Sequence, residues 1–119
     1  MANRPVLGEP AQAPGTIKLE RRAFVRHACE LEALSRAVEL ADSICWGATV
    51  QDVSAGGIGL QLCYPFKAGT FLAVEVRHES RTQTFLVRVV HAADQADGSW
   101  FLGCEFAAPL TEAELADLL

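Results

Sequence analysis

Apolar and polar residues alternate along most of the chain from Cys29 onward, in short runs separated by Gly, Pro, Asp and Ser. A period of two residues is typical of a β-strand with one buried face, because successive side chains point to opposite sides. The pattern predicts strands at residues 29–36, 46–53, 57–63, 70–77, 83–91 and 99–106. Closely spaced strands with short turns favour an antiparallel barrel or sandwich.

Two segments depart from this simple alternation. Residues 29–36 also fit a helix by the spacing of their leucines and by their Ala and Leu content, and we interpret them as a strand. Thr111–Leu119 is predicted to form a short helix, since Thr111 and Glu114 have the spacing of a capping box. This helix is expected to cover part of the barrel or to contact a partner.

The N-terminal residues 1–16 are rich in Ala, Pro and Gly and show no hydrophobic period, which predicts a disordered lead-in. The remainder, residues 17–119, is expected to form one domain, as the length of 119 residues suggests. No apolar run approaches the roughly 20 residues of a membrane span, and no signal-peptide core is present. We therefore expect a cytoplasmic location without membrane insertion.

Charge is unevenly distributed along the chain. The net charge is −5, yet Lys18–Arg26 carries four basic residues and one acidic residue. An acidic protein is a poor general binder of nucleic acids, which are polyanions, so no nucleic-acid partner is expected. A compact basic segment on an acidic body suits a small anion, although a solvated surface run fits the same charges.

The residues that usually carry chemistry give little sign of an enzyme or of a metal site. Cys29, Cys45, Cys63 and Cys104 are widely spaced and form no CxxC pair, so we expect reduced, mainly buried thiols and no zinc site. No Ser, His and acid arrangement is recognisable. Four phenylalanines are predicted to lie in the core: Phe66, Phe71, Phe85 and Phe106.

A first candidate binding motif is the arginine-rich arm that contains Arg21, Arg22 and Arg26. Each guanidinium is a planar fork of donors that matches phosphate oxygens and the Hoogsteen edge of guanine. The flat cation can also stack on a purine. The same spacing of arginines occurs by chance in many proteins, so this motif alone is weak evidence.

A second candidate motif is Asp52-Val53-Ser54-Ala55-Gly56-Gly57. The Asp52 carboxylate can accept hydrogen bonds from guanine, and the Ser54 hydroxyl can donate to a phosphate or base oxygen, or cap the turn. Gly56 and Gly57 allow a left-handed φ and a close approach of a ligand to the backbone. An ordinary hairpin turn accounts for the same residues.

Together the two motifs resemble the PilZ domain family. The resemblance rests on Arg22-x-x-x-Arg26 followed by Asp52-x-Ser54-x-x-Gly57, and on Leu102–Phe106, which is similar to the last strand of PilZ domains. It implies an all-β fold, a six-stranded antiparallel PilZ-type β-barrel with a short C-terminal helix. It also implies binding of cyclic di-GMP on the barrel surface, between the arm and the turn, without a further cofactor.

The resemblance also assigns roles to individual residues. Arg22 and Arg26 are expected to grip phosphates and guanine edges, while Asp52, Ser54 and Gly57 hold the other side of the ligand. An arginine at the position of Arg21 suggests that a stacked pair of ligands is bound.

Binding is expected to reshape the surface for an unidentified downstream protein. The alternative is a PilZ-like adaptor with little or no nucleotide binding. Trp100 is expected in the core or at the barrel rim rather than against a guanine.

Overall fold

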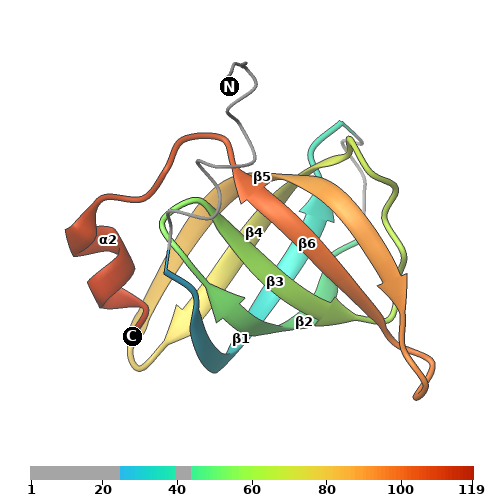
Figure 1. Ribbon diagram of the computed structural model, residues 1–119, viewed down its shortest axis with the longest axis horizontal. Coiled ribbons are helices and arrows are strands. Elements are labelled where there is room, and N and C mark those ends of the chain that lie inside the picture. The colour runs from blue at the N-terminus through green and yellow to red at the C-terminus, as the bar shows by residue number, and fades with distance from the viewer. Residues whose placement is uncertain (1–24, 40–43) are drawn as a thin grey trace, which may run out of the picture.

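The computed structural model describes residues 25–39 and 44–119 of the chain. Six antiparallel strands form a closed barrel in the order β1-β2-β3-β6-β5-β4 (Figure 1). This arrangement confirms the predicted six-stranded all-β fold with a short C-terminal helix. The elements are β1 (His27–Ala37), β2 (Trp46–Val53), β3 (Gly57–Leu62), β4 (Phe71–His78), β5 (Arg81–Asp94), β6 (Trp100–Phe106) and α2 (Glu112–Asp117).

The core is the inside of the barrel, filled by the inward-facing residue of each alternating pair. In β4, for example, Leu72, Val74 and Val76 are buried, while Glu75 and Arg77 are exposed. Burying a Val or Leu side chain contributes about 1.5–3 kcal/mol relative to leaving it exposed. Most of the stability of this small domain therefore comes from the interior rows of its strands.

Residues 29–36 form a strand, as interpreted from the sequence. β1 lies between β2 and β4 and pairs with both of them, so its backbone groups are used on each side. Its leucines do not make a helical stripe, because Ala33, Ser35 and Ala37 face the interior and Leu34 faces outward. Pairing on both sides outweighs the local helix preference of Ala and Leu.

Several predicted burials and boundaries are wrong. Phe71 is 37% exposed, because Leu72 takes the inward position and leaves its neighbour on the outer face. Cys45 and Cys63 are also exposed, because they flank strand ends instead of lying within the barrel wall, whereas Cys104 is buried. β5 continues to Asp94, which the sequence placed in the following loop.

Three strands contain an irregularity that changes which residues face outward. The register of β2 shifts between Val50 and Asp52, so Gln51 is an extra residue opposite β3. β5 has a similar shift between Val89 and His91, and β1 has one near its start. A β-bulge of this kind breaks the period of two and can place two consecutive side chains on one face.

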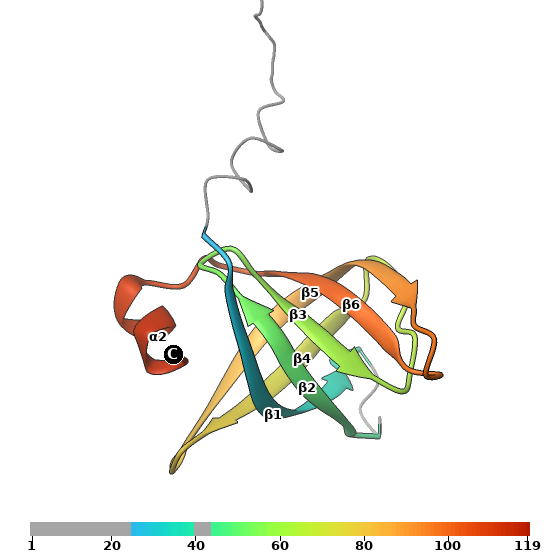
Figure 2. The same cartoon turned by 60° about the horizontal axis from the view of Figure 1, so that its bottom comes forward.

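The C-terminal helix begins with the predicted capping box. The N–H of Glu114 donates to Oγ1 of Thr111 at 3.1 Å, and the N–H of Thr111 donates to Oε1 of Glu114 at 2.9 Å. Leu118 is buried, and Asp117 forms an ion pair of 2.9 Å with Arg81. The helix therefore covers one part of the barrel beside the start of β5 (Figures 1 and 2). No helix in residues 25–39 and 44–119 is long and apolar enough to cross a membrane.

Candidate ligand-binding site

An ion pair joins the arginine arm to the second motif. Nη1 of Arg26 donates to Oδ1 of Asp52 at 2.7 Å. Arg26 directly precedes β1, and Ala28 of β1 lies opposite Asp52 of β2, so strand pairing brings these two distant motifs together. The two side chains are 64% and 26% exposed, so both remain open to a ligand. Arg21 and Arg22 lie outside the described residues.

Ser54 holds the turn between β2 and β3. Its hydroxyl oxygen accepts hydrogen bonds from the N–H groups of Gly56 and Gly57 at 3.2 and 3.1 Å. A backbone bond of 2.9 Å from Ser54 to the Gly57 carbonyl closes the same turn. Ser54 is buried, with only 4% of its surface exposed. Of the two roles considered from the sequence, capping of the turn is the one that this geometry displays.

Gly57 is required for packing, and it does not adopt the left-handed φ that glycine allows. Among the described residues, positive φ angles occur at Glu79, Gly69 and Gly98, so neither Gly56 nor Gly57 has a positive φ. A Cβ on Gly57 would lie 2.5 Å from the carbonyl oxygen of Cys104 on β6. The absence of a side chain therefore lets the end of the turn approach the neighbouring strand.

Asp52 stands at one end of a row that crosses four strands on the outside of the barrel. Asp52 lies opposite Gly59 of β3, Gly59 opposite Gly103 of β6, and Gly103 opposite His91 of β5. The bulges in β2 and β5 occur just before the first and last residues of this row. Bulges near functional sites commonly change the direction in which a side chain points. Here the two bulges lie on either side of Gly59 and Gly103.

Two aromatic rings lie over the glycines of this row. A Cβ on Gly103 would be 2.3 Å from the His91 ring, and a Cβ on Gly59 would be 2.7 Å from Cζ of Phe101. The two ring centroids are 6.1 Å apart. His91 is exposed and Phe101 half-buried, and their rings are tilted by 40° to each other. Phe101 lies over Gly59, which is opposite Asp52. We call His91, Phe101, Gly59 and Gly103 the ring platform.

Sequence reasoning did not include His91 and Phe101 among the candidate site residues. They come from strands that are distant from both motifs in the sequence. To place these two side chains on the outer face, one must know which residues of each strand point outward. One available signal was the pair Gly59 and Gly103, since glycine inside a strand often marks a close approach. Trp100 is half-buried and shares the inward face of β6 with Leu102, in agreement with a core or rim position.

A polar network borders the platform on the side of the β5–β6 loop. Nε2 of Gln51 donates to Oε1 of Gln61 at 2.6 Å, and Gln61 donates in turn to Ser99 at 2.9 Å. Hydrogen bonds from the side chain and backbone of Ser99 lower the pKa of Asp97. These contacts fix the loop against β3, so this border of the surface is held in place.

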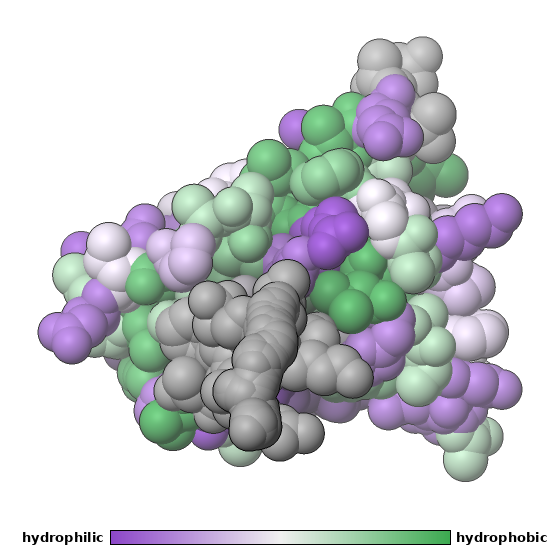
Figure 3. Space-filling view, turned by 45° about the horizontal axis from the view of Figure 1, so that its top comes forward, coloured by the Kyte–Doolittle hydropathy of each residue, from purple (hydrophilic) through white to green (hydrophobic). Residues whose placement is uncertain are grey.

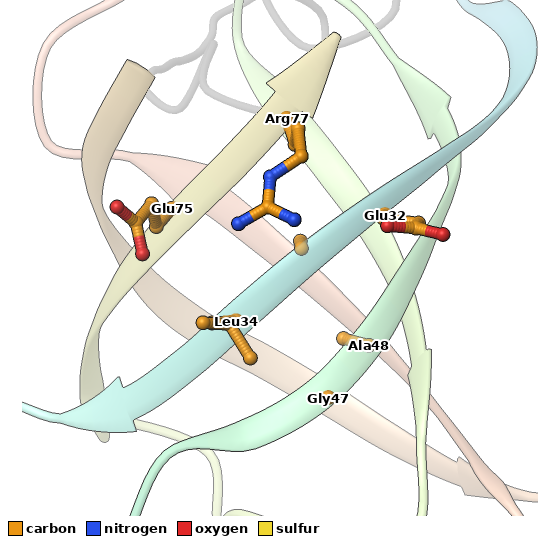
Figure 4. A pocket seen from close by; sticks show the side chains of 7 residues that line it. Glu32, Leu34, Gly47, Ala48, Glu75 and Arg77 are labelled. Carbon is orange, nitrogen blue, oxygen red and sulfur yellow. The ribbon is translucent and has the colours of Figure 1, made fainter. Parts of the chain in front are cut away.

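A hollow of about 240 Å³ lies elsewhere, on the outer face of β1 (Figure 4). Leu34 and Gly47 line it, with Arg77 between Glu32 and Glu75. Two carboxylates and one guanidinium leave this hollow negative, which disfavours an anionic ligand. It lies at the other end of the β1–β2 pair from Asp52, since Leu34 is paired with Gly47.

The outer surface of the barrel mixes polar and apolar side chains (Figure 3). Val25, just before the arm's last arginine, is 69% exposed, and Leu86 of β5 is 46% exposed. Within residues 25–39 and 44–119, no group of three or more His, Cys, Asp or Glu side chains could hold a metal ion. The candidate site is therefore built from an ion pair, a turn and two rings.

Comparisons with known proteins agree with this fold. The chain resembles the PilZ domain of YcgR from Escherichia coli, solved with c-di-GMP, with a TM-score of 0.64 and 17% identity over 82% of this chain and 86% of that one. It also resembles the Bacillus subtilis inhibitor of motility MotI/DgrA, with a TM-score of 0.62 and 21% identity. That match covers 82% of this chain but only 48% of MotI/DgrA, about half of its length. No curated protein matches the sequence.

A model of the PilZ domain family matches residues 20–119, which include the arm, the turn and the whole barrel. PilZ domains serve as cyclic di-GMP receptors or as adaptors. The sequence motifs, the closed barrel and this match lead to one assignment. The chain belongs to the PilZ domain family.

Proposed function

We propose that this protein is a receptor for cyclic di-GMP and acts without catalysis. The ligand is held on the outside of the barrel, between Arg21, Arg22 and Arg26 on one side and the turn that contains Asp52, Ser54 and Gly57 on the other. The observation that carries the proposal is the 2.7 Å contact between Arg26 and Asp52. It joins the two motifs at one exposed place, although 26 residues separate them.

The chemistry of the site suits a nucleotide with two phosphates and two guanines. The arginines of the arm supply positive charge and forked donors for phosphate oxygens and guanine edges. The Asp52 carboxylate supplies an acceptor for guanine N–H groups. The ring platform offers flat faces on which a base can stack, a contact worth about 1–3 kcal/mol per base in single-stranded nucleic-acid binding.

A stacked pair of ligands is part of the proposal. Arg21 adds a third guanidinium to the arm, and two stacked molecules carry twice the phosphate charge of one. Additional cationic charge on the arm offsets that larger negative charge locally. We therefore propose a stoichiometry of two ligands per chain, with Arg21 required for the second one.

The signal passes from the turn to the C-terminal segment. The Gly56 carbonyl accepts a hydrogen bond from the N–H of Phe106 at 3.0 Å, and the Ala55 carbonyl accepts one from Leu110 at 2.8 Å. A ligand that shifts this turn therefore acts on the residues that lead into α2. The downstream protein is proposed to recognise the altered surface, and the receptor is placed in the cytoplasm, where its four free thiols stay reduced.

Isothermal titration with cyclic di-GMP tests the proposal. Charge-assisted hydrogen bonds are worth about 1.5–3 kcal/mol, so Arg22→Ala and Asp52→Ala should each weaken binding about ten- to a hundred-fold. Arg36→Ala is the matched control, because Arg36 is exposed on β1 outside the site and should leave binding unchanged. Folded protein that gives no heat at high micromolar ligand would instead identify an adaptor that works without the nucleotide.

A further inference from the structure

β5 is paired along only part of its length on the side that faces β6. β4 pairs with β5 over residues 81–88. β6 pairs with it only from Val87 onward. The first part of β5 therefore has a neighbouring strand on one side alone within the described chain. Its other side, which we call the open edge, has no strand between it and α2 (Figures 1 and 2).

The backbone groups that point toward this open edge can be identified from the hydrogen bonds nearby. The Leu86 carbonyl accepts from the N–H of Ala107 at 2.9 Å, so the Leu86 groups point to the β6 side. Val89 bonds to the chain just before β4, at 2.7 and 2.9 Å, so it points the other way. Because these directions alternate along a strand, the N–H and C=O groups of Thr82 and Thr84 point toward the open edge.

A groove lies along the edge. Its volume is about 220 Å³, and it is bounded by Thr84 and Leu86 of β5, by Pro109 and Leu110 before the helix, and by Glu114 of α2. The exposed Leu86 side chain contributes apolar surface. A segment lying here would meet backbone donors and acceptors together with an apolar contact.

The helix beside the groove forms an acidic wall, of which Glu114 lines the groove itself. Glu112 and Glu114 lie in the first turn of α2, and its last turn contains no basic residue. At the C-terminal end of α2, Asp117 forms an ion pair of 2.9 Å with Arg81 at the start of β5. These two side chains are 60% and 44% exposed, so their pair is worth little and opens readily. The net negative charge favours a basic occupant and repels nucleic acids.

We propose that the β5 edge at Thr82 and Thr84 docks an extended, basic segment of a partner protein, which adds to the sheet as an antiparallel strand. An extended segment satisfies a row of alternating donors and acceptors, which a helix cannot do because its backbone groups are already bonded internally. The exposed threonines and Arg81 at this edge limit pairing between copies of the chain itself. Its residues lie outside the proposed nucleotide site, so docking can be tested without nucleotide.

A blocked eight-residue peptide of alternating valine and lysine is the probe, used with the full chain and without nucleotide. Titration followed by NMR should show saturable binding, with amide hydrogen exchange at Thr82 and Thr84 slowed at least tenfold. A matched valine and glutamate peptide should bind at least tenfold more weakly. The valine and lysine peptide with N-methylated central residues should bind weakly too, because it lacks donors.

Variants of the protein locate the contact. Thr84→Pro removes one N–H from the open edge and should weaken peptide binding at least tenfold, whereas Thr84→Val keeps the N–H and should bind normally. Glu112→Lys leaves β5 unchanged, so it tests the acidic wall even if the proline variant fails to fold. Glu30→Lys on β1 is its control for net charge.

Several results overturn the proposal. These are absence of binding at millimolar peptide, binding without protection of the Thr82 and Thr84 amides, and equal binding of the lysine and glutamate peptides. Normal peptide binding by folded Thr84→Pro would also overturn the proposal. Equal binding by Glu112→Lys and Glu30→Lys would also contradict the acidic-wall argument.

Discussion

Asp52 and His91 stand at opposite ends of one row across the outside of the barrel, with only Gly59 and Gly103 between them. The two ends come from strands that are far apart in the sequence, and each end follows a β-bulge. The Asp52 carboxylate, the two glycines under the aromatic rings and the His91 ring therefore form one continuous strip. This strip can be tested one residue at a time.

The rings should contribute to affinity without contributing to the fold. His91→Ala and Phe101→Ala are each expected to weaken cyclic di-GMP binding about fivefold to a hundredfold, from a stacking energy of about 1–3 kcal/mol. Titration calorimetry measures the change, and His78→Ala at the end of β4 is the control. Unchanged affinity in both ring variants would remove the platform from the site.

Gly103 and Gly57 should respond differently to the same substitution. In Gly103→Ala the new methyl group meets the exposed His91 ring, which can move aside, so ligand binding should fall while stability changes little. In Gly57→Ala it meets a backbone oxygen at 2.5 Å, which cannot move freely, so the cost should be about 1–3 kcal/mol. Urea unfolding and ligand titration of both variants separate the two effects. Equal losses of stability would contradict the distinction.

Ser54→Ala should lower stability more than it lowers the affinity of the folded protein. The hydroxyl lies in the turn and accepts from two backbone N–H groups, which alanine leaves without that partner. The expected loss is about 1–2 kcal/mol in the free energy of unfolding. Denaturant unfolding measures it, with Ser80→Ala in the β4–β5 hairpin as control. A large loss of affinity with full stability would show instead that the hydroxyl contacts ligand.

The four thiols should react at very different rates. Cys45 and Cys63 are exposed, whereas burial raises the pKa of the Cys104 thiol to about 12. Only about one in ten thousand Cys104 thiols would be ionised at pH 8 in the folded state. A thiol reagent at pH 8 should therefore modify Cys45 and Cys63 quickly and Cys104 only on unfolding, as mass spectrometry of digests can show. Comparable labelling rates in native protein would disprove this burial.

The same thiol affects stability at high pH. Because the pKa of Cys104 is raised from 9.0 to about 12 in the folded state, folding retains its proton. The contribution of the protonated thiol to the free energy of unfolding is complete below pH 9 and is lost as pH rises from 9 toward 12. Cys104→Ala should therefore show a smaller fall in stability between these values than the parent protein does. Parallel pH profiles for the two proteins would argue against the assignment.

Much of the fold could be predicted from the sequence because apolar and polar residues alternate with a period of two residues in most strands. Leu72, Val74 and Val76 are a clear case, since each polar neighbour is exposed. The helix could be predicted from two residues, because a capping box is a local signal. Local patterns are informative when the structure that they specify is itself local.

The errors arise where a local pattern does not determine the three-dimensional neighbour. Phe71 looked like core, yet its position in the alternation puts it outside. Gly57 was interpreted as a turn glycine that allows a left-handed φ, and its actual constraint is the Cys104 carbonyl from a strand almost 50 residues later. His91 lies after a bulge that shifts the phase of β5, so simple alternation could not place it beside Gly103.

The bonds from Phe106 and Leu110 to the turn after β2 have a consequence for the order of folding. The turn is supported by residues that are synthesised long after it, so a nascent chain that ends before β6 lacks this support. Binding competence and completion of the barrel should therefore arise together in one cooperative step. Ligand would then stabilise only finished molecules, and its full binding energy would appear as resistance to global unfolding.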